Sequence, residues 1–101
     1  MILGGCGFLG SVVTKHLVGQ DWDVRVFDKV GTDTTRLKEV ASKIEFVRGD
    51  FMSVGDLRNA LDGVPVVIHL VGTTIPQTSM ADIQFEIETN VLPTVRLLEL
   101  M

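Results

Sequence analysis

A chain of 101 residues with 46% hydrophobic and 22% charged side chains has the composition of a single small soluble domain, residues 1–101. Its net charge of −4 and its singly scattered Lys and Arg residues argue against the basic patch that nucleic-acid binding requires. One cysteine, no basic leader and no apolar stretch long enough to span a bilayer together predict a cytoplasmic protein that does not enter membranes.

The first half of the chain alternates apolar runs with segments of helical period. Residues 1–3 predict a brief strand that ends in glycines, and from Leu9 apolar residues recur at helical spacing until Gly19. The apolar positions of this helix are Val12, Val13 and Leu17. Residues 23–28 alternate in polarity and are rich in valine, which predicts a second strand.

The pattern then repeats twice. A weaker helix is predicted over residues 32–42, with Leu37, Val40 and Ala41 as its apolar face, and a third strand over 44–48. Ser53 begins a capping-box sequence for a helix that closes at Gly63. The continuous apolar run over 66–71 is typical of a parallel strand covered on both faces.

A long amphipathic helix ends the chain, after a loop rich in Thr, Pro and Gln. Ser79 begins a second capping-box candidate. The apolar stripe of the helix is Ile83, Ile87, Val91, Val95 and Leu98. Pro93 interrupts this stripe, so we expect either a kink or a start later than Ser79. The complete order, βαβαβαβα, predicts an α/β fold with a doubly wound parallel sheet and right-handed crossovers.

The glycines at positions 4, 7 and 10 lie between the first strand and the first helix, which makes their pattern informative. In such a loop one glycine permits a tight turn, another lets the backbone approach a pyrophosphate, and a third lets helix and strand pack closely. The helix N-terminus offers N–H groups to the phosphates. No Lys follows Gly10, so a triphosphate-binding loop is unsupported; the alternative is a plain strand-to-helix turn.

Asp28 ends the second strand, 18 residues after Gly10. A carboxylate at this place accepts hydrogen bonds from ribose hydroxyls and repels a 2′-phosphate, which favours NAD over NADP. The neighbouring Lys29 weakens the argument against NADP, and a surface aspartate at a strand end is the alternative interpretation.

Later landmarks connect this loop to a known family. They are Arg48-Gly49-Asp50-Phe51, Val67-Ile68-His69-Leu70-Val71-Gly72 and the segment that begins Asn90-Val91-Leu92-Pro93. With the glycine loop, they resemble the extended short-chain dehydrogenase/reductase family, the NAD-dependent epimerases and dehydratases of nucleotide sugars, over nearly the whole chain. The resemblance implies a Rossmann-type sheet in strand order 3-2-1-4, bound NAD that transiently oxidises the sugar, and a nucleotide sugar as the small-molecule partner.

The resemblance also implies the cofactor-binding residues. The glycine loop holds the pyrophosphate, Asp28 takes the adenosine ribose, and Asp50 with Phe51 lies beside the adenine. The loop after the fourth strand passes under the nicotinamide side, and Asn90 supports the geometry of the site. The expected set is Gly4, Gly7, Phe8, Leu9, Gly10, Asp28, Asp50, Phe51, Val71, Gly72 and Asn90, with no metal ligand.

Catalysis in that family uses a Tyr-x-x-x-Lys pair, and this chain contains no tyrosine. We therefore expect a cofactor-binding part without catalytic residues; a stand-alone dinucleotide-binding or sensing module is the alternative. The two differ in whether the coding sequence continues past Met101 into such a pair. An edge position for the fourth strand and the apolar stripe of the last helix predict self-association. His69 is expected to be a neutral, hydrogen-bonded imidazole, and Cys6 a small residue filling a turn.

Overall fold

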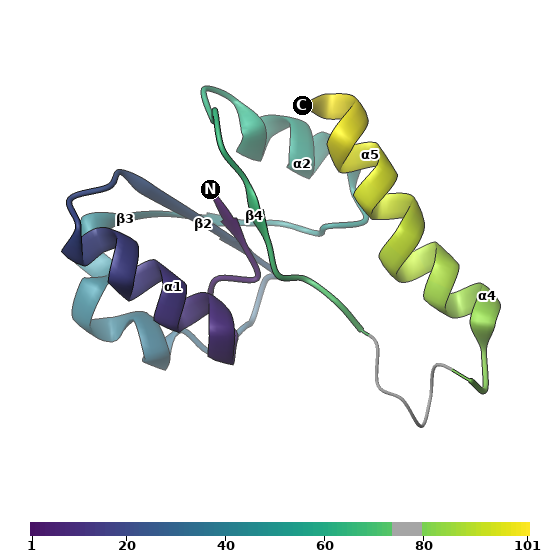
Figure 1. Ribbon diagram of the computed structural model, residues 1–101, viewed down its shortest axis with the longest axis horizontal. Coiled ribbons are helices and arrows are strands. Elements are labelled where there is room, and N and C mark those ends of the chain that lie inside the picture. Colours follow the sequence, from purple (N-terminus) through teal and green to yellow (C-terminus); the bar gives the residue numbers. More distant parts are fainter. Residues whose placement is uncertain (74–79) are drawn as a thin grey trace.

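A four-stranded parallel sheet forms the centre of the protein, as the computed structural model shows for residues 1–73 and 80–101 (Figure 1). The strands are β1 (Ile2–Leu3), β2 (Val24–Asp28), β3 (Ile44–Arg48) and β4 (Ile68–His69). Their order is β3-β2-β1-β4, and all three pairings are parallel. This confirms the predicted α/β Rossmann-type fold and its strand order.

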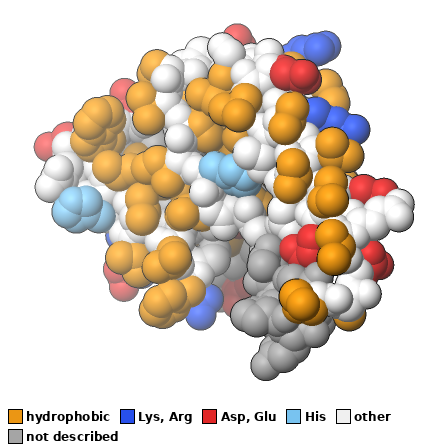
Figure 2. Space-filling view, turned by 45° about the vertical axis from the view of Figure 1, so that its right-hand side comes forward, with side chains coloured by type: hydrophobic (Ala, Val, Ile, Leu, Met, Phe, Trp, Pro, Cys, Tyr) orange, Lys and Arg blue, Asp and Glu red, His pale blue; other side chains and the backbone are white. Residues whose placement is uncertain are grey.

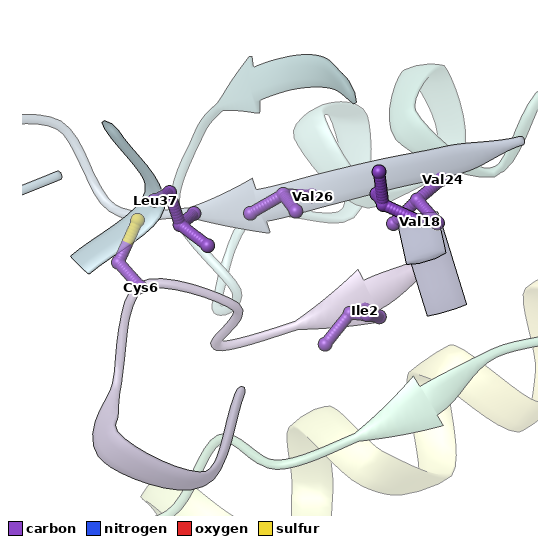
Figure 3. Close-up of a cluster of buried hydrophobic side chains, with 6 residues drawn as sticks. All are labelled: Ile2, Cys6, Val18, Val24, Val26 and Leu37. Carbon is purple, nitrogen blue, oxygen red and sulfur yellow. The ribbon is translucent and has the colours of Figure 1, made fainter. Parts of the chain in front are cut away.

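Helices cover both faces of the sheet. Helix α1 (Phe8–Gly19) and the 3₁₀ helix η1 (Thr35–Lys43) lie on one face, while α2 (Val54–Leu61) and α5 (Leu92–Leu100) lie on the other (Figure 1). Successive residues of a strand point to opposite faces, so Val26 and Phe27 of β2 enter two different hydrophobic cores. The core under α1 and η1 contains Ile2, Cys6, Val18, Val24, Val26 and Leu37 (Figure 3). The core under α2 and α5 contains Leu3, Phe27, Phe51, Leu57, Ala60 and Leu97.

Helix α1 packs on the sheet partly through residues other than the apolar positions predicted for it. Val12 is 58% exposed, although Val13 and Leu17 do pack against the core. The buried positions are instead Gly10, Ser11, Thr14 and Val18. Small residues face the sheet because the start of the helix lies directly against the glycine loop. The prediction from hydrophobic period is therefore confirmed for Val13 and Leu17 and wrong for Val12, and the physical reason is close backbone packing.

The segment predicted as a weak helix over 32–42 forms a 3₁₀ helix over Thr35–Lys43. Thr35 N–H donates to Asp33 Oδ1 over 2.9 Å, so a local side-chain bond competes with regular helix at this end. Leu37 is buried and Val40 is partly buried, but Ala41 is exposed. The predicted apolar face is therefore only partly used.

The cap of α2 forms half of the predicted capping box. Ser53 Oγ accepts from the Asp56 N–H over 3.3 Å, as such a motif requires. The Asp56 carboxylate does not return to Ser53, because it accepts the N–H of Asp50 over 2.8 Å. The helix ends at Leu61, and Gly63 follows with a φ of +69°.

The regular part of β4 is shorter than the predicted strand over 66–71. Strand β1 has only two residues, which limits the ladder to Ile68 and His69. Three further bonds extend the pairing: the Met1 ammonium donates to Val66 O (2.7 Å), Ile68 N–H donates to Met1 O (2.9 Å), and Leu70 N–H donates to Leu3 O (3.0 Å). Strand β4 is an edge of the described sheet.

The last helix begins with α4 (Ile83–Glu86), continues through the π-helical turn η2 (Ile87–Val91) and ends as α5. Its N-cap is Asp82, whose carboxylate accepts from Phe85 N–H over 2.9 Å; the predicted cap, Ser79, lies outside the described residues. The alternative of a later start is confirmed. Pro93 is buried near the start of α5 and lacks the N–H of an ordinary helical residue, and the wider π turn directly precedes it.

The predicted apolar stripe of this helix faces away from the described body of the protein. Its members are Ile83, Ile87, Val91, Val95 and Leu98, which are 64%, 45%, 51%, 45% and 66% exposed. Figure 2 shows hydrophobic side chains gathered on the side of the molecule where this helix lies. Among the described residues, no helix is both long and apolar enough to cross a membrane.

Candidate functional site

A cleft of about 570 Å³ opens at the carboxyl ends of the parallel strands. The chain passes from β1 to β2 and β3 on one side and then returns to β4 on the other, so the cleft lies at the topological switch point. Its lining residues come from every loop that leaves a strand. They are Gly4, Cys6, Gly7, Phe27, Asp28, Lys29, Thr32, Asp33, Arg36, Gly49, Asp50, Phe51, Met52, Leu70, Val71, Gly72, Thr73 and Thr89.

The glycine loop forms the floor of the cleft. Gly4 has a φ of +80°, a conformation that favours glycine, and its N–H donates to Phe27 O over 2.8 Å. Gly7 N–H donates back to Gly4 O over 3.1 Å, which closes the turn. A Cβ at Gly10 would collide with the carbonyl oxygen of Gly4 and lie 2.7 Å from Gly5 Cα. The loop is therefore as tight as the sequence predicts.

The N-terminus of α1 follows directly from this loop. Gly7 is the N-cap and contributes no side chain, and the first turn contains no acidic residue. The N–H groups of Phe8, Leu9 and Gly10 have no partner inside the helix, because they begin it. Phe8 and Leu9 are 71% and 63% exposed, and neither they nor Gly10 line the cleft, which the N-cap residue Gly7 does line. An anion at this end of the cleft would therefore meet α1 beside its N-cap.

Asp28 lies beside the glycine loop and is held by three donors. Its Oδ2 accepts the N–H of Cys6 over 2.9 Å, across a sequence separation of 22 residues. Its Oδ1 accepts the N–H of Lys29 over 2.9 Å and the hydroxyl of Thr32 over 3.2 Å. The carboxylate thus ties the end of β2 to the glycine loop while lining the cleft.

Cys6 is buried within the glycine loop, 3% exposed. Burial raises the pKa of its thiol to about 11, and the negative charge and hydrogen bond of Asp28 act in the same direction. The thiol is therefore protonated near neutral pH. Because the thiolate is the reactive form, Cys6 is a poor nucleophile. This agrees with its predicted role as a small residue filling the turn.

Asp50 and Phe51 lie on the wall of the cleft after β3. Asp50 is exposed, and its Oδ1 accepts the N–H of Met52 over 2.8 Å. Phe51 is only 8% exposed, and its ring centroid lies 4.8 Å from that of His69. Phe51 is therefore a core residue whose edge reaches the cleft, whereas the Asp50 carboxylate stands at the surface.

Val71 and Gly72 line the cleft after β4, but Asn90 does not. Asn90 instead forms hydrogen bonds with Thr73, the residue after Gly72. Its Oδ1 accepts the N–H of Thr73 over 2.9 Å, and its Nδ2 donates to Thr73 Oγ1 over 3.0 Å. Nδ2 also donates to Glu86 Oε2 over 2.9 Å. The structure thus places Asn90 as a support for the loop and outside the group of residues that line the cleft, and its expected part in cofactor binding stays a prediction.

His69 connects β4 to the last helix beneath this loop. Its Nδ1 accepts the N–H of Val71 over 3.3 Å, so its proton is assigned to Nε2, which faces Thr94 Oγ1 at 3.0 Å. Burial lowers the pKa of the imidazole below its ordinary value. His69 is therefore a neutral, hydrogen-bonded side chain, as predicted.

Sequence reasoning missed several residues that line the cleft. Thr32 and Arg36 enter it from the segment after β2, and Thr89 enters it from the last helix; Thr73, which also lines the cleft, belongs to the loop after the fourth strand that the resemblance implies. The rule that ligands bind beyond the carboxyl ends of parallel strands pointed to the loops that carry Thr32 and Thr73. No sequence signal pointed to Arg36, whose guanidinium carbon lies 5.9 Å from the centroid of the Phe8 ring.

Together, the parallel sheet, the glycine loop and the carboxylate at the switch point define a Rossmann-type class of domain. The model of the 3-beta hydroxysteroid dehydrogenase/isomerase family matches residues 1–100. The chain belongs to this family, within the extended short-chain dehydrogenases/reductases.

Individual relatives agree with this assignment. CDP-paratose 2-epimerase of Salmonella typhi is 33% identical over 105 residues, which cover 98% of this chain and 31% of the relative. Sterol-4-alpha-carboxylate 3-dehydrogenase, decarboxylating, of Bos taurus is 39% identical over 69 residues, which cover 67% of this chain and 17% of the relative.

A solved structure gives the same result in three dimensions. The dTDP-glucose 4,6-dehydratase DesIV of Streptomyces venezuelae, with NAD and TYD bound, superposes with a TM-score of 0.84 at 28% identity. The match covers 98% of this chain and 34% of DesIV. The chain thus spans about a third of the length of its full-length relatives.

Proposed function

We propose that this chain is the NAD-binding portion of an enzyme that epimerises or dehydrates a nucleotide sugar. The observation that carries the proposal is the junction, on one cleft, of the Asp28 carboxylate with the glycine loop that ends at Gly7, the N-cap of α1. NAD is found in the DesIV structure, which matches nearly the whole chain. The proposal that the substrate is a nucleotide sugar rests on the similarity to DesIV and to CDP-paratose 2-epimerase.

The described residues fit a dinucleotide. Gly4 and Gly7 bring backbone without side chains to the cleft, and the close packing of Gly10 against Gly4 keeps the turn tight. The N–H groups that begin α1 would hold the pyrophosphate, and Asp28 would accept hydrogen bonds from the adenosine ribose. Asp50 and Phe51 would lie beside the adenine, and Val71 and Gly72 under the nicotinamide side. When bound, NAD supplies the hydride acceptor for transient oxidation of the sugar.

A hydroxysteroid is the second candidate substrate. The family whose model matches residues 1–100 is described by 3-beta hydroxysteroid dehydrogenase/isomerase activity, and the bovine sterol dehydrogenase is among the relatives. Under either proposal the cleft described here holds the cofactor. We favour the nucleotide sugar because two relatives that match 98% of this chain, one by sequence and one by structure, are a CDP-paratose 2-epimerase and a dTDP-glucose 4,6-dehydratase.

Titration calorimetry with NAD and NADP tests the cofactor, with Asp28→Asn as the main variant. Asparagine keeps one acceptor oxygen for the loop and removes the negative charge, whereas Asp28→Ala also leaves the Cys6 N–H without its acceptor. We expect the chain to prefer NAD, and Asp28→Asn to weaken NAD binding by about tenfold, because hydrogen bonds to a charged group contribute about 1.5–3 kcal/mol.

Asp62→Asn is the matched control, since Asp62 is exposed and lies outside the cleft. It removes the same charge and should leave both affinities unchanged. Equal binding of NAD and NADP by the unaltered chain, or no effect of Asp28→Asn, would contradict the assignment of Asp28 to the ribose.

We also propose that the protein is cytoplasmic and that copies of this chain self-associate. The exposed stripe of the last helix and the edge strand β4 support the association, because apolar surface and unpaired strand edges favour contact with another chain. Sedimentation velocity should show dimers or larger species that Val95→Glu shifts toward the monomer. Arg58→Glu is the control, because it introduces the same side chain at an exposed position of α2. A monomer at high concentration would refute the proposal.

A further inference from the structure

The segment after β2 contains a turn that returns a hydroxyl to Asp28. Thr32 N–H donates to Lys29 O over 3.3 Å, and Gly31, the third residue of this four-residue turn, has a φ of +83°. Both features are those of a type II turn, in which glycine is favoured at the third position. A Cβ at Gly31 would meet no atom within 4 Å, so the backbone conformation rather than crowding requires glycine.

This turn places the Thr32 hydroxyl 3.2 Å from Asp28 Oδ1, which also accepts the Lys29 N–H. The other oxygen, Oδ2, is held by the Cys6 N–H. An ionised carboxylate offers about four lone-pair sites, and three of them are therefore engaged by the protein. With both oxygens engaged from opposite sides, the carboxylate has one fixed orientation beside the cleft.

The orientation matters because the rim of the cleft has mixed charge. Lys29 and Arg36 line the same cleft as Asp28 and would attract a 2′-phosphate. If the carboxylate could turn away, the two cations would be free to bind the 2′-phosphate of NADP. A fixed carboxylate instead repels that phosphate and keeps an acceptor oxygen in place for a ribose hydroxyl of NAD. Discrimination between NAD and NADP therefore depends on what holds Asp28, and not only on its presence.

We propose that Thr32 is a positioning residue for cofactor selection, which acts by fixing the Asp28 carboxylate through its hydroxyl. The inference rests on the proposed binding of NAD and adds a residue on which its selectivity depends. Thr32 is partly exposed, so its hydroxyl can be removed without opening a core.

The test compares Thr32→Val, which removes the hydroxyl, with Thr32→Ser, which keeps it. Calorimetry with NAD and NADP gives the ratio of the two dissociation constants. We expect Thr32→Val to reduce the preference for NAD by about tenfold, in line with the loss of one hydrogen bond to a charged group, and Thr32→Ser to stay within about twofold of the unaltered chain. A merely structural role would weaken both cofactors equally and leave the ratio unchanged.

A second measurement tests the hydrogen bond between Thr32 and Asp28 without any cofactor. Hydrogen exchange of the Cys6 amide, followed by NMR, reports how firmly Asp28 is held, because that amide donates to Asp28 Oδ2. Faster exchange in Thr32→Val than in Thr32→Ser supports the positioning role, even if the unaltered chain binds neither dinucleotide and the proposed function fails. Equal exchange in the two variants, or an NAD preference that Asp28→Asn lowers and Thr32→Val does not, would overturn it.

Discussion

Gly10→Ala is expected to lower the free energy of unfolding by about 3 kcal/mol or more, the upper range for forcing atoms into a packed interior. The added Cβ would collide with the carbonyl oxygen of Gly4 and lie 2.7 Å from Gly5 Cα, and both atoms belong to backbone that no side-chain rotation can move. The loop would have to open, which also breaks the bond from Gly7 N–H to Gly4 O. Urea unfolding followed by circular dichroism measures the loss.

Gly19→Ala is the matched control, because it makes the same chemical change in the same helix. A Cβ at Gly19 meets no atom within 4 Å, and its φ lies outside the left-handed range. Alanine is favoured over glycine in helices by about 1 kcal/mol, so this variant should be as stable as the unaltered chain or slightly more so. Equal stabilities for the two alanine variants would mean that α1 does not pack on the glycine loop as described.

Much of this fold could be predicted from the sequence because its signals are local. The alternation of strands and helices follows from apolar period and from glycine, and the structure confirms the order of all the predicted elements. The strand order came from the family resemblance. At the site, the glycine loop and Asp28 were identifiable because their spacing reflects contacts between a strand end and the next helix. The structure brings Gly4, Gly7 and Asp28 to one cleft.

What the sequence did not predict depends on contacts between distant segments. The buried face of α1 is set by the close approach of Gly10 to Gly4, which overrides the apolar positions at Leu9 and Val12. The short ladder of β4 is set by its partner β1 and not by its own apolar run. Asn90 reaches Thr73 over a separation of 17 residues, so its support of the loop is visible only once the helix lies beside it.

Thr32 shows the same limit at the site itself. Its turn has a local signal, since glycine at position 31 favours a type II turn, but the acceptor of its hydroxyl could not be predicted. The Cys6 N–H that holds the second oxygen of Asp28 comes from the glycine loop, 22 residues away. The residues of the site were therefore easier to find than the bonds that orient them.

Phe27→Ala is expected to remove about 3–5 kcal/mol, the usual loss when a large buried aromatic side chain is truncated. Phe27 is 1% exposed and fills the core under α2 and α5. It also supports the cleft, because its ring packs so closely on Gly49 that a Cβ added there would lie 2.8 Å from it. Small domains are stable by about 5–15 kcal/mol in total, so the loss approaches the whole stability of this chain. Thermal unfolding followed by circular dichroism should show a transition tens of degrees lower, since about 1 kcal/mol corresponds to 4–8 °C in a domain of this size.

Phe8→Ala makes the same truncation on the surface, where the ring is 71% exposed and contacts the Arg36 guanidinium at 5.9 Å. We expect a change within about 0.5 kcal/mol, as for most surface substitutions. The pair compares a buried aromatic residue that lines the cleft with an exposed one that does not. Phe27 fills the core under α2 and α5, whereas we expect the side chain of Phe8 to be dispensable for stability. A loss at Phe8 as large as that at Phe27 would contradict this assignment and would show that the start of α1 is buried.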